Sequence, residues 1–282
     1  KKLTSLNKVF SNISSVSNKM NQPTFVIGGY VRDLLLERDS DDIDIVTLGS
    51  GIELAKKVGE EVKAHKVSVF KNFGTAMIKK EDYELQFVGA RKESYSKNSR
   101  NPIVENGTLD DDQKRRDFTI NALAISLNEE NKGILIDPFE GISDLANKII
   151  KTPLNPDITF SDDPLRMMRA IRFSAQLNFE IEELTFKGIV KNASRINIVA
   201  QERITEELNK IILSSHPSKG FKLLDKSGLL KIIFPAFDTL KGVEFIDGNG
   251  HKDNFYHTLQ VLENILPHSK NNLWLRWAAI LH

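Results

Sequence analysis

Hydrophobic residues recur at two spacings along this chain, and the spacing changes about midway. Up to about Pro138, short runs rich in β-branched residues alternate with runs of helical period. Residues 66–89 have the pattern of a meander, whereas helical runs separate the other strands. We therefore predict an α+β fold with a small mixed β-sheet and flanking helices. The predicted strands are 24–27, 43–47, 66–70, 74–79, 84–89 and 135–136, and the predicted helices are 3–19, 29–37, 51–60 and 113–124.

Beyond about residue 150 the strand signals fade, and the apolar runs have a helical period. Pro153, Asn155 and Pro156 cluster between the two kinds of pattern, as residues that link domains often do. The sequence therefore predicts a head over residues 1–150 and an all-helical remainder. The predicted helices of that remainder are 161–179, 181–195, 200–214, 217–227 and 254–266.

Composition narrows the classes of protein to which this chain can belong. The 282 residues carry a net charge of +1, so any nucleic acid would have to be held by local basic clusters. The absence of cysteine excludes disulfides, thiolate zinc sites and cysteine nucleophiles, and it fits a reducing, cytoplasmic location. No apolar run approaches the roughly 20 residues of a membrane span. We expect no membrane partner and infer no obligate protein partner.

The two ends of the chain lead us to expect a portion of a longer protein. The first residue is Lys1 rather than methionine, and no signal-peptide pattern follows it. The last residues, NLWLRWAAILH, end inside an apolar run without a helix stop signal.

Two aspartates lie on one predicted strand. Asp42 and Asp44 flank Ile43, and side chains at i and i+2 of a strand point to the same face. The two carboxylates are therefore expected side by side, with Ile43 facing the core. Such a pair repels itself unless a divalent cation lies beside it, and its oxygen donors suit Mg²⁺. The alternative is a pair of solvated aspartates at the end of a strand.

A double glycine joins the first predicted strand to a helix. Gly28 and Gly29 let bare backbone N–H groups approach an anion at the start of that helix. Arg32, one turn into the helix, has the fork geometry that binds phosphate oxygens. The alternative is a tight strand-to-helix turn with a surface arginine. The carboxylate pair downstream favours the phosphate-binding interpretation.

The segment KRRDFTINALAI places two arginines and an aspartate before an apolar run. Arg115, Arg116 and Asp117 precede the run, and Asn121 lies one turn beyond Asp117. One interpretation is a second clamp for phosphate or nucleotide. The other is an ordinary helix start with solvated arginines.

The segment DDPLRMMRAIRF carries three arginines at helical spacing. Arg166, Arg169 and Arg172 fall at i, i+3 and i+6, and Asp163 lies a turn before the first of them. An amphipathic helix with a basic face is the simpler interpretation. Arginines without lysine on that face favour planar, bidentate contacts instead. An aspartate beside an arginine offers both acceptors and donors to the edge of a nucleotide base.

These segments resemble the motifs of the tRNA nucleotidyltransferase and poly(A) polymerase family of the bacterial and eukaryotic type. The resemblance extends from about Phe25 to the end of the chain. It implies a nucleotidyltransferase head over residues 1–150, a helical neck over residues 151–235 that binds the nucleotide base and RNA, and the truncated start of a helical HD-type body over residues 236–282. The matching pieces, in the family's order, are GGYVRDLLL, DID, FGTAMI, RRDFTINALA, DPFEGISDL, DDPLRMMRAIRF and QERITEEL.

The resemblance also implies roles for single residues. The family's metal-binding, catalytic carboxylates fall on Asp42 and Asp44. Many relatives carry a further acidic residue on a later strand, where this chain has Gln86, with Glu84 two residues earlier. A third carboxylate is therefore not expected here. The nucleotide contacts of the family fall on Gly29, Arg32 and Arg116 in the head and on Asp163, Arg166, Arg169 and Arg172 in the neck.

The implied activity is template-independent addition of CCA to the 3′ end of tRNA from CTP and ATP, with two Mg²⁺ ions. Poly(A) polymerase, and enzymes that add only CC or only A, share these motifs and remain alternatives. The intact Asp42 and Asp44 argue against an inactive RNA-binding relative. A phosphohydrolase built on His257 and His282 would need an aspartate after His282, so core histidines are the better interpretation. The GGxxR turn lacks the GxGxxG spacing of dinucleotide-binding oxidoreductases.

Overall fold

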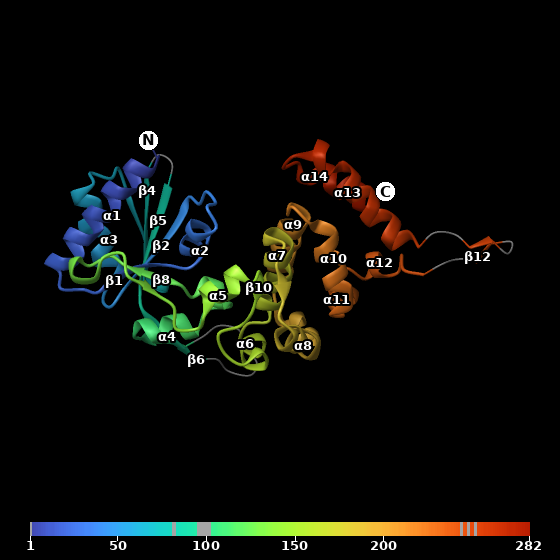
Figure 1. Cartoon of the computed structure of the whole chain (residues 1–282), viewed down its shortest axis with the longest axis horizontal. Coiled ribbons are helices and arrows are strands. Elements are labelled where there is room, and N and C mark those ends of the chain that lie inside the picture. Colours follow the sequence, from blue (N-terminus) through green and yellow to red (C-terminus); the bar gives the residue numbers. More distant parts are fainter. Residues whose placement is uncertain (1, 81–82, 95–102, 243–244, 247–248, 251–252) are drawn as a thin grey trace. The chain divides into compact units, whose positions relative to one another are not determined.

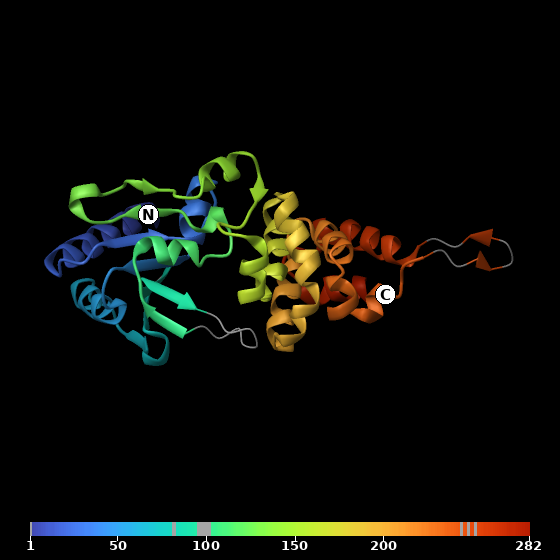
Figure 2. The same ribbon diagram turned by 90° about the horizontal axis from the view of Figure 1, so that it is seen from below.

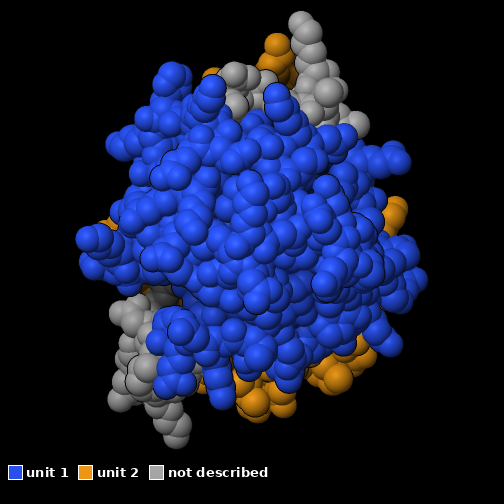
Figure 3. Space-filling view, turned by 90° about the vertical axis from the view of Figure 1, so that its left-hand side faces the viewer, with its two compact units in different colours: residues 1–94, 102–147 blue, residues 95–101, 148–282 orange. Residues whose placement is uncertain are grey.

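The chain folds into two compact units. The computed structural model describes residues 2–80, 83–94, 103–242, 245–246, 249–250 and 253–282. Unit 1 comprises residues 1–94 and 102–147, and residues 148–282 belong to unit 2 (Figures 1 and 3). None of the described helices combines the length and apolar character that a membrane crossing needs. The division of the helical part into residues 151–235 and 236–282 stays a prediction.

A seven-stranded mixed sheet organises unit 1 (Figure 1). Its strand order is β3-β4-β5-β2-β1-β8-β9, and β2 and β5 run parallel while the other five neighbouring pairs are antiparallel. The consecutive antiparallel pairing of β3, β4 and β5 confirms the predicted meander. The strands are β1 (Thr24–Ile27), β2 (Asp42–Thr47), β3 (Val67–Phe70), β4 (Thr75–Lys80), β5 (Tyr83–Gly89), β8 (Ala124–Ser126) and β9 (Leu135–Ile136).

The helices of unit 1 bury one face of this sheet. Helix α3 (Gly51–Glu61) packs on β4 and β5, and α1 (Lys2–Lys19) packs against α3 (Figures 1 and 2). Ile43 and Ile45 of β2, which point to this face, are 1% and 0% exposed. The side chains of the alternate residues point to the opposite face, where the predicted chemistry lies. The remaining elements of unit 1 are α2 (Gly29–Leu35), β6 (Arg91–Ser94), β7 (Ile103–Asn106), α4 (Leu109–Lys114) and α5 (Gly141–Ala146).

The helix predicted over residues 113–124 is wrong. Helix α4 ends at Lys114, a 3₁₀ turn covers Thr119–Asn121, and the chain then enters β8. Strand β8 pairs with β1, and the N–H of Gly28 donates to the carbonyl of Leu123 at 3.0 Å. The apolar spacing of this segment is compatible with a helix, but strand pairing with β1 satisfies its backbone instead, so tertiary context overrides the local pattern.

Among the described residues of unit 2, the regular secondary structure is helical apart from two short β pairs. Strand β10 (Ile149–Ile150) runs parallel to β11 (Glu180–Ile181), and β12 (Phe245–Ile246) runs antiparallel to β13 (Asn249–Gly250). The helices, which Figure 2 shows from below, are α6 (Pro156–Asp162), α7 (Leu165–Leu177), α8 (Glu183–Asn192), α9 (Gln201–Ile212), α10 (Pro217–Lys226), α11 (Leu229–Ile233), α12 (Pro235–Asp238), α13 (Asn254–Ser269) and α14 (Leu273–Ile280).

The helix predicted over residues 161–179 is in fact two helices. Helix α6 ends at Asp162 and α7 begins at Leu165. Asp163 between them has extended backbone angles, with φ −133° and ψ 98°, because the following Pro164 disfavours a helical conformation in the residue before it. A proline at the junction therefore places Asp163 at the start of α7 rather than inside a longer helix.

Candidate active site

The two predicted carboxylates lie on the sheet face that is opposite the helix-covered one. Asp42 is exposed and Asp44 is half-buried, while the intervening Ile43 is in the core. Among the described residues, none donates a hydrogen bond to either carboxylate. The oxygens of Asp42 and Asp44 are thus available to a ligand on this face.

The double-glycine turn lies directly against Asp44. Ile27, the last residue of β1, is the register partner of Asp44 on β2. Gly28 follows with a left-handed φ of 85°. A Cβ atom on Gly28 would lie 3.4 Å from Oδ2 of Asp44 and 2.6 Å from Nη1 of Arg116. The turn, one carboxylate and one arginine therefore meet at a single place, where a Cβ on Gly28 would displace the end of the Arg116 side chain.

Burial raises the pKa of the Asp44 carboxyl above its ordinary value. The positive charge of Arg116 opposes this effect, and the negative charges of Asp112 and Asp42 add to it. The charged form of Asp44 is therefore less favoured than in water. A cation beside it would favour the carboxylate.

Arg116 is held by a buried carboxylate that sequence analysis did not single out. Asp112, on α4, is 0% exposed. Its Oδ2 accepts a hydrogen bond from Nε of Arg116 at 3.2 Å, and its Oδ1 accepts one from Nε of Arg115 at 3.0 Å. The i, i+3 and i, i+4 spacing of Asp112 to the two arginines was visible in the sequence, but the burial that makes this ion pair matter was not.

Arg32 is fixed by neighbours on two elements. Its Nε donates to Oδ1 of Asp33 at 3.0 Å, and its Nη1 donates to Oδ1 of Asn121 at 2.7 Å. Asn121 in turn donates from Nδ2 to Oδ1 of Asp117 at 3.0 Å, and its carbonyl accepts a hydrogen bond from Nη1 of Arg116 at 3.4 Å. Asn121 thus joins the two arginines that the sequence assigned to phosphate binding.

The strand next to β2 carries one acidic and one amide residue beside the two aspartates. In the parallel register, Glu84 of β5 lies beside Asp42, and Gln86 lies beside Asp44. Within the described part of the chain, no group of three or more Asp, Glu and His side chains is arranged to hold a metal ion. The strand residue beside Asp44 is therefore a neutral amide, whereas the one beside Asp42 is Glu84. His257 and His282 also belong to no such group.

The four remaining predicted residues lie in unit 2, on and before α7. Asp163 lies just before α7, and its Oδ1 accepts a hydrogen bond from the N–H of Leu165 at 3.2 Å. Arg172 is buried, and its Nε donates to Oε2 of Glu207 on α9 at 2.6 Å. The guanidinium of Arg172 also lies 4.0 Å from the ring centroid of Phe173, and that of Arg169 lies 5.4 Å from it.

These contacts divide the predicted arginine band into two parts. Arg172 is anchored within unit 2 by Glu207, whereas Arg166 and Arg169 are only partly buried. The structure thus brings Asp42, Asp44, Gly28 and Arg116 together in unit 1, with Arg32 joined to them through Asn121. It places Asp163 and the three arginines along one helix of unit 2.

Two protein families match this chain. The family described as the Poly A polymerase head domain matches residues 24–151. The family described as a probable RNA and SrmB-binding site of polymerase A matches residues 178–241.

Curated relatives agree with these matches. The chain is 39% identical over 203 residues to an A-adding tRNA nucleotidyltransferase of Aquifex aeolicus, which covers 71% of this chain and 24% of the relative. It is 36% identical over 233 residues to a CCA-adding enzyme of Limosilactobacillus reuteri, which covers 81% of this chain and 56% of the relative. The chain therefore spans between about a quarter and about half of the length of these relatives.

Solved structures show the same fold. The CCA-adding enzyme of Thermotoga maritima in complex with tRNA has a TM-score of 0.78 at 27% identity, over 99% of this chain and 63% of the other. A tRNA nucleotidyltransferase with a primer tRNA and an incoming ATP analogue has a TM-score of 0.77 at 28% identity, over 95% of this chain and 75% of the other.

Proposed function

Because this chain belongs to the family of tRNA nucleotidyltransferases and poly(A) polymerases, we propose that it adds nucleotides to the 3′ end of tRNA without a template. The observation that carries this proposal is the meeting of Asp44, the Gly28 turn and Arg116 on the sheet face opposite Ile43. Carboxylates for a metal ion and cationic donors for a triphosphate are the two requirements of nucleotidyl transfer.

Asp42 and Asp44 fit a magnesium site. Their oxygens are hard donors without hydrogen-bond donors from described residues, and burial and like charge raise the pKa of Asp44 until a cation is present. When bound there, Mg²⁺ would lower the pKa of the RNA 3′-hydroxyl and neutralise charge on the departing pyrophosphate. We propose that two ions bind and that both are Mg²⁺.

The cationic side chains of unit 1 would orient the triphosphate. Arg116 is held by Asp112 next to the acidic pair, and Arg32 is held by Asp33 and Asn121 at the start of α2. Gly29 opens this helix, where backbone N–H groups favour an anion. Because these groups are fixed before the substrate arrives, little reorganisation is needed when charge develops.

Nucleotide choice would come from unit 2. We propose that Asp163 and Arg166 contact the edge of the incoming base, with Arg169 and Arg172 lining the same pocket. One bidentate contact to a base discriminates by about 1–3 kcal/mol. Several such contacts are therefore enough to prefer CTP and ATP.

We propose CCA as the product, in the cytoplasm that the absence of cysteine favours. A-addition is the second candidate, because two relatives named as A-adding enzymes are 39% and 37% identical to this chain. The test is to incubate the protein with labelled CTP or ATP and tRNAs that end before CCA or after CC. If the protein incorporates only ATP, and only on the tRNA that ends after CC, the proposed product is A rather than CCA.

The acidic pair provides the sharpest test of the chemistry. Replacing Asp42 or Asp44 by alanine should lower incorporation by on the order of a thousandfold, because the metal ion and its electrostatic stabilisation are lost. Asp39→Ala, in the exposed loop before β2, is the matched control and should keep full activity. Substantial activity in the Asp44→Ala protein would remove this residue from the proposed metal site.

A further inference from the structure

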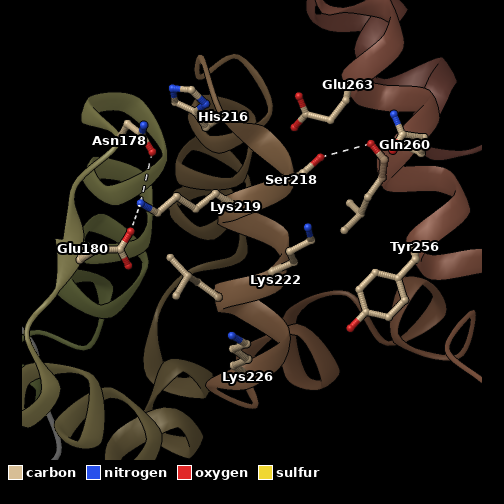
Figure 4. Close-up of a pocket in the computed structure, with 12 residues that line it drawn as sticks. Asn178, Glu180, His216, Ser218, Lys219, Lys222, Lys226, Tyr256, Gln260 and Glu263 are labelled. Carbon is tan, nitrogen blue, oxygen red and sulfur yellow. Dashed lines mark hydrogen bonds and ion pairs between the residues drawn. The ribbon is translucent and has the colours of Figure 1, made fainter.

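A groove of about 630 Å³ lies within unit 2, between helices α10 and α13 (Figure 4). Its volume is in the range of sites that bind small ligands or parts of larger ones. The hydroxyl of Ser218 on α10 donates to the carbonyl of Leu259 on α13 at 3.2 Å, which ties the two walls together. The matching RNA-binding family ends at residue 241, so that it includes α10 but not α13.

Three lysines of α10 line the groove, but they differ in their partners. Lys219 donates to Oε1 of Glu180 at 2.6 Å and to Oδ1 of Asn178 at 3.3 Å, so its charge is neutralised. Lys222 and Lys226 are exposed, and no described residue forms an ion pair with either of them. They are four residues apart on one helix face, a spacing at which like charges repel. An anion between them would turn this repulsion into attraction.

Tyr256 faces these lysines from the first turn of α13. Its side chain is 54% exposed, although its backbone is held by the Asp253 cap, whose Oδ1 accepts a hydrogen bond from the Tyr256 N–H at 3.2 Å. The ring of the buried Phe255 packs edge-on against it, with centroids 5.2 Å apart. Tyr256 is therefore an exposed aromatic ring at a capped helix start, an arrangement on which a base can stack.

Figure 4 shows Lys222, Lys226 and Tyr256 at one end of the groove, with His216 and Glu263 at the other. From this asymmetry we infer that the groove between α10 and α13 is an RNA subsite, in which Lys222 and Lys226 bind phosphates of the backbone and Tyr256 stacks on a neighbouring base. This inference rests on the proposed function, because it names a place where the RNA substrate is held. It adds α13 to the RNA-binding surface.

The test measures binding of a fluorescent tRNA that ends before CCA, over a series of salt concentrations. The Lys222→Ala/Lys226→Ala protein should lose about two units from the slope of log K against log salt, because each phosphate contact contributes about 0.9. Tyr256→Leu should raise the Kd roughly tenfold with an unchanged slope, whereas Tyr256→Phe should bind normally because it keeps the ring. Affinity for ATP and CTP should not change in these variants.

Lys231→Ala/Lys270→Ala provides the matched control, since both lysines are exposed in unit 2, no described residue forms an ion pair with either, and neither lines the groove. Circular dichroism of all variants would verify that they fold. If the control lowers the salt slope as much as the groove variant does, or if the groove variants bind tRNA as the unmodified chain does, the subsite is refuted while the proposed function stands. If the unmodified chain binds no tRNA, both are refuted.

Discussion

Gly28 lies between a carboxylate and a guanidinium, and its backbone angle and its close neighbours both favour glycine. Its φ of 85° is unfavourable for residues with a Cβ, and that atom would lie 2.6 Å from Nη1 of Arg116. Gly133 has nearly the same φ of 83°, but nothing lies within 4 Å of its missing Cβ. A comparison of variants at the two glycines can therefore distinguish the effect of backbone strain from the effect of displacing Arg116.

Replacing either glycine by alanine should cost about 1 kcal/mol of unfolding free energy, because both backbones are left-handed. Only Gly28→Ala should also raise the KM for ATP and lower kcat, since it pushes Arg116 away from Asp44. Thermal unfolding and steady-state kinetics measure the two effects. Equal activity of the two variants would show that the position of Arg116 does not matter for the reaction.

Asp112 illustrates how a residue without ligand contact can shape the site. Asp112→Ala would leave Arg115 and Arg116 without their buried partner, and such a loss costs on the order of 3 kcal/mol. We expect the variant to be destabilised and to bind ATP more weakly. In a double-mutant cycle with Arg116→Ala, the losses in ATP affinity should not add, because both changes remove the same positioned arginine. Additive losses would contradict a positioning role.

At the scale of elements, α4 is the short helix that carries Asp112, and its stability depends on its N-terminal cap. Thr108 and Asp111 form a capping box: the Thr108 N–H and hydroxyl donate to Oδ2 of Asp111 at 2.9 and 2.8 Å, and the Asp111 N–H donates back to the Thr108 hydroxyl at 3.2 Å. Six residues have few internal hydrogen bonds, so the cap and the ion pairs of Asp112 stabilise the helix.

The capping box makes the stability of unit 1 depend on pH. Hydrogen bonds from Thr108 lower the pKa of the Asp111 carboxyl from its ordinary value of 3.8. A lowered pKa in the folded state stabilises the protein above the ordinary pKa, and this stabilisation is lost as pH falls through the folded value. Asp111→Asn should therefore unfold more easily than the unmodified chain at pH 7, with a difference that narrows in acid below about pH 4.

Denaturant titrations at several pH values check this prediction. Thr108→Val should show the same pH dependence. The double variant should lose little more unfolding free energy than either single variant. A difference that stayed constant from pH 7 into acid would mean that the charge of Asp111 does not contribute through the cap.

At the scale of the whole molecule, the proposed chemistry and the proposed choice of base belong to different compact units. The acidic pair and the phosphate-binding arginines lie in unit 1, and Asp163 and Arg166 lie in unit 2. The net charge of +1 provides no general attraction for RNA, so that local clusters have to hold it. Changes in unit 2 are thus expected to alter specificity without removing the catalytic groups.

Asp163→Ala or Arg166→Ala should reduce the preference for CTP and ATP over GTP and UTP by about tenfold, because a base contact is worth about 1–3 kcal/mol. The Kd for tRNA should change little. Competition assays with the four nucleotides measure the preference, and Arg203→Ala, an exposed arginine of α9, is the control. Unchanged preference together with lost tRNA affinity would show that these residues hold RNA rather than read the base.

The sequence by itself determined the elements whose patterns are local. The strands of the meander and most helices lie within a few residues of their predicted positions, because side-chain period and turn residues report directly on them. Strand period also predicted that Asp42 and Asp44 lie on the same face of one strand, and motif order placed them near the Gly28 turn. Asp163, in contrast, was expected inside a helix over residues 161–179, and the structure places it between α6 and α7.

Only the tertiary structure decided the features that depend on partners far apart in the chain. Residues 119–126 form a turn and a strand rather than a helix because β1 offers backbone hydrogen bonds there. Asp112 became the anchor of two arginines because folding buries it, and Asn121, 89 positions after Arg32 in the sequence, joined Arg32 to Arg116. The groove between α10 and α13 likewise exists only after packing. Local period cannot encode such contacts, since their stability comes from desolvation and from the partner that folding supplies.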